Sequence, residues 1–254
     1  MAPLPDTETR VRLTRRPVEP VVMRQEWQHL LFLHWRVAPE TVQARLPAGL
    51  TIDTFAGDAY IALVPFTMRN VRPVWSPAVA GLSHFHEINV RTYVYSNQTG
   101  EPGVWFFSLD AANPVAVALA RVLFHLPYYT ARMTLDRAAG EDGRVAYRSV
   151  RGTGESEIVS AMDYMPTGAV RTADPGSLDH FLCERYLLYA HDGARLSAGR
   201  VYHTPYPLRE AVVEGLSDGL VEAAGFGRIA DAAPAHIAYA GGVDVEVFGL
   251  RAVG

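Results

Sequence analysis

Lysine is absent from this chain of 254 residues, so all 23 of its basic residues are arginine. Arginine stays protonated and cannot act as an amine nucleophile, whereas a desolvated lysine can. No internal side chain can therefore form a Schiff base with a carbonyl substrate or with pyridoxal phosphate. The absence also excludes Walker-type phosphate loops and protein-kinase sites, because both place a lysine on the phosphates.

Cysteine, long apolar runs and excess positive charge are scarce as well. Cys183 is the single cysteine, which excludes an internal disulfide and a multi-cysteine metal site and suits a reducing compartment. No run of 18 apolar residues and no signal peptide is seen, so we expect a cytoplasmic protein without a membrane partner. The net charge is −4 and the one basic cluster, at 10–16, reads best as a solvated arm. We therefore expect no nucleic-acid partner.

The remaining pattern predicts a leader or edge segment over 1–24 and a single domain over 25–254. Short alternating stretches bounded by turn residues are typical of strands joined by hairpins. We expect strands at 58–73, 84–96, 103–110, 129–137, 144–151, 185–191, 195–203 and 243–250. Isolated helices are expected at 38–50, 113–124 and 174–186. This order favours the α+β class, mainly antiparallel β, with a few packed helices.

The helix expected at 113–124 has clear start signals. Asn113 is a suitable N-cap and Pro114 suits the first helical position. The segment is apolar nearly all round, which predicts that it is buried. Arg121 is its one charged residue, so it either caps the end of its own helix or pairs with a carboxylate such as Glu87 or Asp110.

The strand "HFHEINVRTYV" contains the strongest candidates for chemistry. Strand alternation places Glu87, Asn89, Arg91 and Tyr93 on one face. That face is either exposed to solvent or lines a cavity, and alternation alone cannot decide between the two. Inside a cavity, Arg91 would bind an anion and Glu87 could transfer protons.

Other familiar chemistries have weak support. His84 and His86 have the spacing of some metal ligands, but a site needs a third ligand, which His203 or His34 could supply only by an accident of folding, so we expect no metal. No Gly-x-Ser-x-Gly motif is present, and Cys183 lies among apolar residues as a structural thiol would. No cofactor is predicted.

Several motifs in order resemble the uncharacterised YqjF-like family, which is grouped with the acetoacetate decarboxylase-like superfamily. They are "HW" (34–35), "LPAGL" (46–50), "VPF" (64–66), "HEINVRTYV" (86–94), "VWFFSLDA" (104–111), "LPYY" (126–129), "ERYLLYA" (184–190) and "VYHTPYPL" (201–208). The resemblance implies an acetoacetate decarboxylase-like β-sheet or barrel around a central cavity. It implies no activity, because none is established for the family.

Acetoacetate decarboxylases resemble this chain through the motif Gly-Arg-Glu-x-x-Gly-x-Pro-Lys-Lys, which corresponds here to "ARVLFHLPYY". Arg121 and Pro127 keep their places, Val122 replaces the glutamate, and Tyr128 and Tyr129 stand where the two lysines would. The resemblance therefore implies a cavity whose catalytic amine has been replaced by phenols.

These observations leave three hypotheses. The first is non-covalent binding of a small carboxylate- or carbonyl-bearing metabolite, and the second is an acid–base enzyme catalysing an enolisation, dehydration or hydrolysis. The third is a structural or homo-oligomeric module with a filled cavity. We expect Glu87 and Tyr128 as the catalytic pair, and Arg91, Arg121, Tyr129 and Asn89 as ligand-binding residues.

Overall fold

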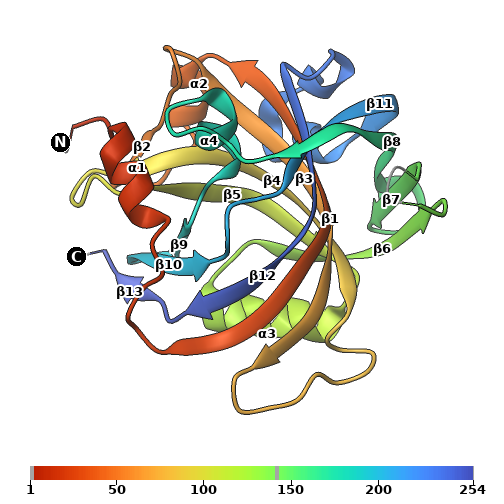
Figure 1. Ribbon diagram of the computed structural model, residues 1–254, viewed down its shortest axis with the longest axis horizontal. Coiled ribbons are helices and arrows are strands. Elements are labelled where there is room, and N and C mark those ends of the chain that lie inside the picture. Colours follow the sequence, from red (N-terminus) through yellow and green to blue (C-terminus); the bar gives the residue numbers. More distant parts are fainter. Residues whose placement is uncertain (1–2, 141–142, 254) are drawn as a thin grey trace.

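The structure is a computed structural model that describes residues 3–140 and 143–253 (Figure 1). Its strands are β1 (Val21–Val37), β2 (Leu50–Ile52), β3 (Ala59–Pro73), β4 (Phe85–Ser96), β5 (Pro102–Ala111), β6 (Tyr128–Arg137), β7 (Val145–Arg151), β8 (Ile158–Arg171), β9 (Leu187–His191), β10 (Leu196–Tyr202), β11 (Leu208–Asp218), β12 (His236–Phe248) and β13 (Arg251–Ala252). Its helices are α1 (Thr7–Leu13), α2 (Pro39–Gln43), α3 (Pro114–Phe124) and α4 (Leu178–Cys183), with short turns η1 (Gly154–Ser156), η2 (Glu222–Phe226) and η3 (Ile229–Asp231). None of the described helices is both long and apolar enough to cross a membrane.

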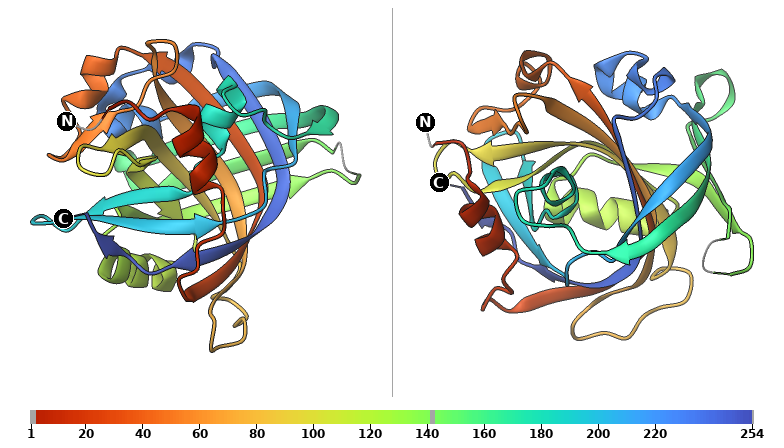
Figure 2. Two further views of the ribbon diagram at one scale, coloured as in Figure 1. Left: turned by 60° about the vertical axis from the view of Figure 1, so that its left-hand side comes forward. Right: turned by 45° about the horizontal axis from the view of Figure 1, so that its top comes forward.

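The strands form one sheet that closes on itself. Their order is β13-β10-β9-β5-β6-β7-β8-β11-β12-β1-β3-β4-β2, and further pairings join β4 to β5 and β10 to β12. The right-hand view of Figure 2 looks into the resulting ring, with α4 seen within its outline. The predicted class, mainly antiparallel β with a few helices, is confirmed.

The long central strands separate two hydrophobic cores. Along β1, Leu30 and Phe32 belong to one core, whereas Leu31 and Leu33 belong to the other. The same alternation in β4 puts Phe85 in the first core and Ile88 in the second. Because both faces of these strands are covered, residues on the face of β4 that carries Glu87 point into the protein rather than into solvent.

β5 departs from the antiparallel pattern, because its pairings with both β6 and β9 are parallel. β5 pairs in parallel with β6, and Leu109 lies opposite Tyr128 in that ladder. Parallel neighbours need a crossover connection, which α3 supplies. On the other side of β5, Leu109 lies opposite Asn89 of β4. The crossover therefore brings Tyr128 into the same row as Asn89, two strands away.

Helix α3 begins as predicted but is not buried. The side chain of Asn113 accepts hydrogen bonds from the backbone N–H groups of Val115 and Ala116, as an N-cap does. The prediction of burial is wrong, because Val117 is the one buried residue of the helix. The reason is its position: α3 lies across an open end of the ring, so part of its apolar surface faces a cavity and part faces solvent.

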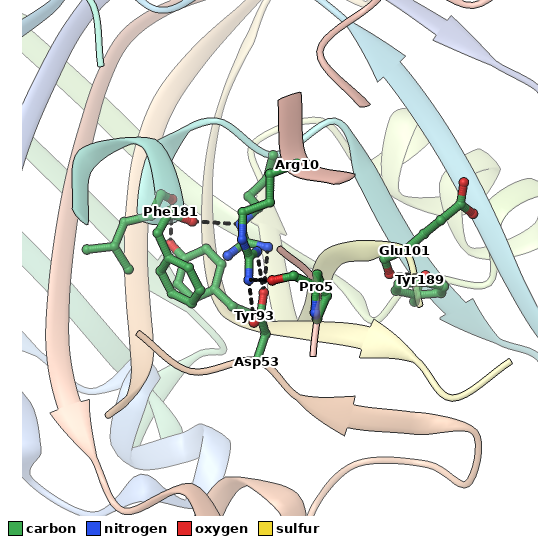
Figure 3. A network of polar contacts seen from close by, with 9 residues as sticks. Pro5, Arg10, Asp53, Tyr93, Glu101, Phe181 and Tyr189 are labelled. Atoms are coloured by element: carbon green, nitrogen blue, oxygen red, sulfur yellow. Dashed lines mark hydrogen bonds and ion pairs between the residues drawn. The ribbon is translucent and has the colours of Figure 1, made fainter. Parts of the chain in front are cut away.

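The N-terminal segment is folded against the ring. Helix α1 buries Leu13, and Arg10 forms an ion pair with Asp53 at 2.6 Å, as Figure 3 shows. The interpretation of 10–16 as a solvated arm is therefore corrected, because a fully buried carboxylate binds one of its arginines. β1 begins at Val21, so the predicted boundary between 24 and 25 falls inside a strand.

Candidate functional site

A cavity of about 370 Å³ lies on the face of β4 that carries Glu87, Asn89 and Arg91, and all three side chains line it. β4 alternates regularly over this stretch, paired throughout with β3, so residues 87, 89 and 91 share one side. Tyr128 enters the same cavity from β6. The structure thus brings together four of the six residues that the sequence singled out.

Glu87 and Tyr128 form a hydrogen-bonded pair. The Tyr128 hydroxyl donates to Oε2 of Glu87 at 2.9 Å, and Glu87 is 3% exposed. Burial raises the pKa of Glu87 from its ordinary value of 4.5 to about 8; the bond from Tyr128 partly opposes this, and nearby Asp110 adds to it. The carboxyl group is therefore mainly protonated at neutral pH. A neutral acid beside a phenol can donate hydrogen bonds to a carbonyl oxygen or deliver a proton.

Arg91 lies further along β4. Its Nε and Nη2 atoms are buried and have no hydrogen-bond partner among the described residues. The guanidinium carbon instead lies 5.7 Å from the ring centre of Phe32 and 5.9 Å from that of Tyr93. Oδ1 of Asn89 is also buried without a partner among these residues. Unpaired polar atoms are costly inside a protein, so this end of the cavity is suited to a polar or anionic ligand group.

Three further arginines at the cavity wall, Arg72, Arg185 and Arg200, were missed in the sequence, and of these Arg185 is buried. Arg185 is 7% exposed; its Nη1 bonds to Asp53 at 2.9 Å and its Nε donates to the backbone oxygen of Phe181 at 2.7 Å. Burial lowers its pKa to about 10, opposed by the charge of Asp53, so it stays protonated at neutral pH. Asp53 is shared with Arg10 and lies beside Tyr93 and Phe181 in Figure 3. The motif "ERYLLYA" contains Arg185 but does not show that it lines the cavity, because its carboxylate partner lies 132 residues away.

Arg121 and Tyr129 lie outside the cavity. Nε of Arg121 donates to the backbone oxygen of Tyr128 at 2.6 Å and forms no ion pair with Glu87 or Asp110. The Tyr129 ring lies 4.0 Å from the guanidinium carbon of Arg151. Arg151, and not Arg121, forms the ion pair with Asp110. Consecutive strand residues point to opposite faces, so Tyr128 and Tyr129 cannot both line the cavity. We therefore leave Arg121 and Tyr129 out of the proposed site.

Of the two candidate metal ligands, His86 lies on β4 and His84 is the last residue of the loop that precedes β4. His86 contacts the Thr67 hydroxyl at 3.0 Å, and His84 accepts a hydrogen bond from the backbone of Asn70. Across the part of the chain that the structure describes, no group of three or more His, Cys, Asp or Glu side chains could hold a metal ion.

The cavity opens between α3 and the loop of residues 74–84, which joins β3 to β4. Figure 1 places both at the same end of the molecule. Leu119 and Leu123 of α3 line the opening, as do Val79 and Leu82 of the loop. All four are also exposed to solvent, so the mouth is apolar.

The chain belongs to the DUF2071 family of uncharacterized conserved proteins, whose model matches residues 24–244. It is 38% identical to the uncharacterized protein YqjF of Bacillus subtilis over 193 residues, which are 76% of this chain and 77% of that protein. The predicted resemblance to the YqjF-like family is therefore confirmed.

Solved structures that share this fold include an acetoacetate decarboxylase and an acetoacetate decarboxylase-like enzyme. An acetoacetate decarboxylase-like enzyme from Sphingomonas wittichii RW1 aligns with a TM-score of 0.62 at 14% identity, covering 92% of this chain and 94% of that one. The enduracididine biosynthesis enzyme MppR, solved with HEPES bound, gives 0.62 at 16% identity over 94% and 89%. The acetoacetate decarboxylase of Legionella pneumophila gives 0.60 at 12% identity over 94% and 90%. At these identities the likeness shows the fold alone.

Proposed function

We propose that this protein binds a small carboxylate- or carbonyl-bearing metabolite in the cavity without forming a covalent bond to it. The observation that carries the proposal is Arg91, whose guanidinium has buried nitrogen atoms without partners on the cavity wall. A carboxylate would satisfy these donors with charge-assisted hydrogen bonds. The cavity volume of about 370 Å³ falls in the range of small-molecule sites, which favours a binding protein over a scaffold with a filled cavity.

Binding can be tested by thermal unfolding with a panel of carboxylates, keto acids, ketones and aldehydes. A ligand at ~100 times its Kd stabilises by about 2.7 kcal/mol, which raises the Tm of a domain of this size by roughly 5–10 °C. In Arg91→Met this shift should disappear, while the ligand-free protein should be at least as stable as the wild type, because two buried nitrogen atoms without hydrogen-bond partners have been removed.

The matched control is Arg228→Met. Arg228 is exposed and pairs with Asp231 on the surface, so this variant should keep the full ligand-induced shift. An undiminished shift in Arg91→Met would refute the role of Arg91, and no shift with any compound of the panel would refute the proposal.

A second candidate function is acid–base catalysis on the bound ligand. It is favoured by Glu87, whose pKa of about 8 keeps a proton available near neutral pH beside the Tyr128 hydroxyl. Glu87→Gln separates the two functions: a binding protein should keep most of its ligand affinity. An enzyme should lose about 10²–10⁴-fold in rate with little change in binding.

The cellular compartment and the partners of the protein are also part of the proposal. The buried thiol of Cys183 supports a reducing, cytoplasmic compartment. The net charge of −4 supports a small-molecule partner rather than a nucleic acid. Assembly into a homo-oligomer stays a prediction, which sedimentation measurements would test.

A further inference from the structure

We propose that the ligand is an amphipathic, medium-chain carboxylate of about eight to ten carbons, whose head binds Arg91 and whose tail leaves through the mouth between α3 and the 74–84 loop. This inference rests on the proposed function and specifies its ligand class. It follows from the composition of the cavity wall, its size and the exposed apolar surface at its opening.

The cavity wall between Arg91 and the mouth is largely hydrocarbon. Apart from the polar residues already described and a few others at its edges, such as Gln25 and Ser83, it is lined by apolar side chains. They include Val64 and Phe66 of β3, Phe85 of β4, and Val104, Phe106 and Leu109 of β5. A small, fully polar metabolite would leave this surface facing water or empty space. An alkyl chain would bury it, with a gain of roughly 0.8 kcal/mol per methylene.

The dimensions suit a chain rather than a compact ligand. A water molecule, with one non-hydrogen atom, occupies about 30 Å³ in the liquid. On that basis a cavity of about 370 Å³ holds roughly twelve non-hydrogen atoms, as many as a ten-carbon carboxylate has. Arg91 lies four residues from Glu87 along β4, a span of roughly 13 Å between their backbones. Glu87 is close in sequence to the 74–84 loop, so the head group and the mouth lie at opposite ends of this path.

The Glu87–Tyr128 pair lies on the path of the chain and is compatible with it. Glu87 is mainly protonated at neutral pH, so no carboxylate charge has to be desolvated when hydrocarbon passes it.

The mouth exposes apolar side chains that such a tail would cover. On α3, Leu119 is 56% exposed and Leu123 is 57% exposed, and both line the cavity. Val79 and Leu82 face them from the loop and are likewise exposed. Exposed apolar groups that gather around a pocket mark a binding site more often than groups scattered over a surface do.

The test measures affinity for saturated straight-chain acids from two to twelve carbons by calorimetry, at pH 7 and below their micelle concentrations. We expect affinity to rise about fourfold per methylene and to level off near ten carbons. Affinity that does not change with chain length, but is still lost in Arg91→Met, would overturn this inference and leave the proposed function intact. Failure of every acid to bind would overturn this inference alone, because the proposed function also covers keto acids, ketones and aldehydes and is refuted only by a flat response across the whole thermal-unfolding panel.

Two variants of α3 locate the tail. Leu119→Gln should weaken binding of the ten-carbon acid several-fold and leave butyrate unchanged. Val122→Gln is the matched control, because Val122 is apolar and 72% exposed on the same helix but does not line the cavity. Equal effects of the two substitutions on ten-carbon binding would contradict the proposed path. So would a wild-type dimer that both substitutions dissociate, since a second copy of the chain would then cover α3.

Discussion

Replacing Glu87 with glutamine should make the protein more stable at neutral and alkaline pH and change little at acidic pH. In the wild type, burial raises the pKa of Glu87 from 4.5 to about 8, so between these pH values the folded chain binds a proton that the unfolded chain has lost. Wild-type stability therefore falls as the pH rises through this window. Glutamine has no proton to lose, and its amide oxygen can still accept the hydrogen bond from Tyr128.

The expected size of the effect follows from the shift. One proton contributes about 1.4 kcal/mol per pH unit to the free energy of unfolding. Over the interval from 4.5 to about 8, the difference between Glu87→Gln and the wild type should grow to about 3–5 kcal/mol and then stay constant. Other titrating groups are common to both proteins, so their contributions cancel in the difference.

The measurement is urea unfolding of both proteins at half-unit steps from pH 5 to 9. Glu222→Gln is the control, because Glu222 is exposed and its substitution should give a small difference that does not change with pH. A difference between Glu87→Gln and wild type that stays flat across this range would show that Glu87 is ionised in the folded protein. The neutral acid proposed for the cavity would then be refuted.

Two further substitutions test the partners of the buried charges. Tyr128→Phe removes the hydrogen bond that lowers the pKa of Glu87. The stability of this variant should therefore level off at a pH above 8, higher than in the wild type, in the same unfolding series. Asp53→Asn leaves the buried Arg185 without its counter-charge and should reduce the free energy of unfolding by about 3–5 kcal/mol. Asp58→Asn, which breaks an exposed pair, should reduce it by less than about 1 kcal/mol, and equal losses would contradict this account.

The parts of the fold that the sequence predicts well are those with local signals. The hairpin from β4 to β5 and the one from β6 to β7 lie close to their predicted ranges, because turn residues separate alternating stretches. β1 was not predicted as a strand, although it is 17 residues long. Its segment from Leu30 to Trp35 is buried on both faces by the two cores, so hydrophobic residues do not alternate with polar ones.

The candidate site likewise contains residues that local sequence signals predict and residues that they do not. Strand alternation alone groups Glu87, Asn89 and Arg91, because they are two residues apart. Tyr128 could be suggested only by the resemblance, since its contact with Glu87 depends on a parallel crossover through α3. The exposure of α3 could not be predicted, because an apolar helix beside a ligand cavity has the same composition as one buried in a core.

The tyrosine at position 128 affects the protonation of Glu87 because it supplies no positive charge there. The motif of acetoacetate decarboxylases that resembles residues 120–129 has a lysine where this chain has Tyr128, whose hydroxyl is within hydrogen-bond distance of Glu87. An ammonium group there would attract the carboxylate and oppose the effect of burial on its pKa. A phenol supplies one weak hydrogen bond and no charge, and burial raises its own pKa well above 10. With a phenol at this position, the hydrogen bond from Tyr128 only partly opposes the effect of burial, and Glu87 stays mainly protonated at neutral pH.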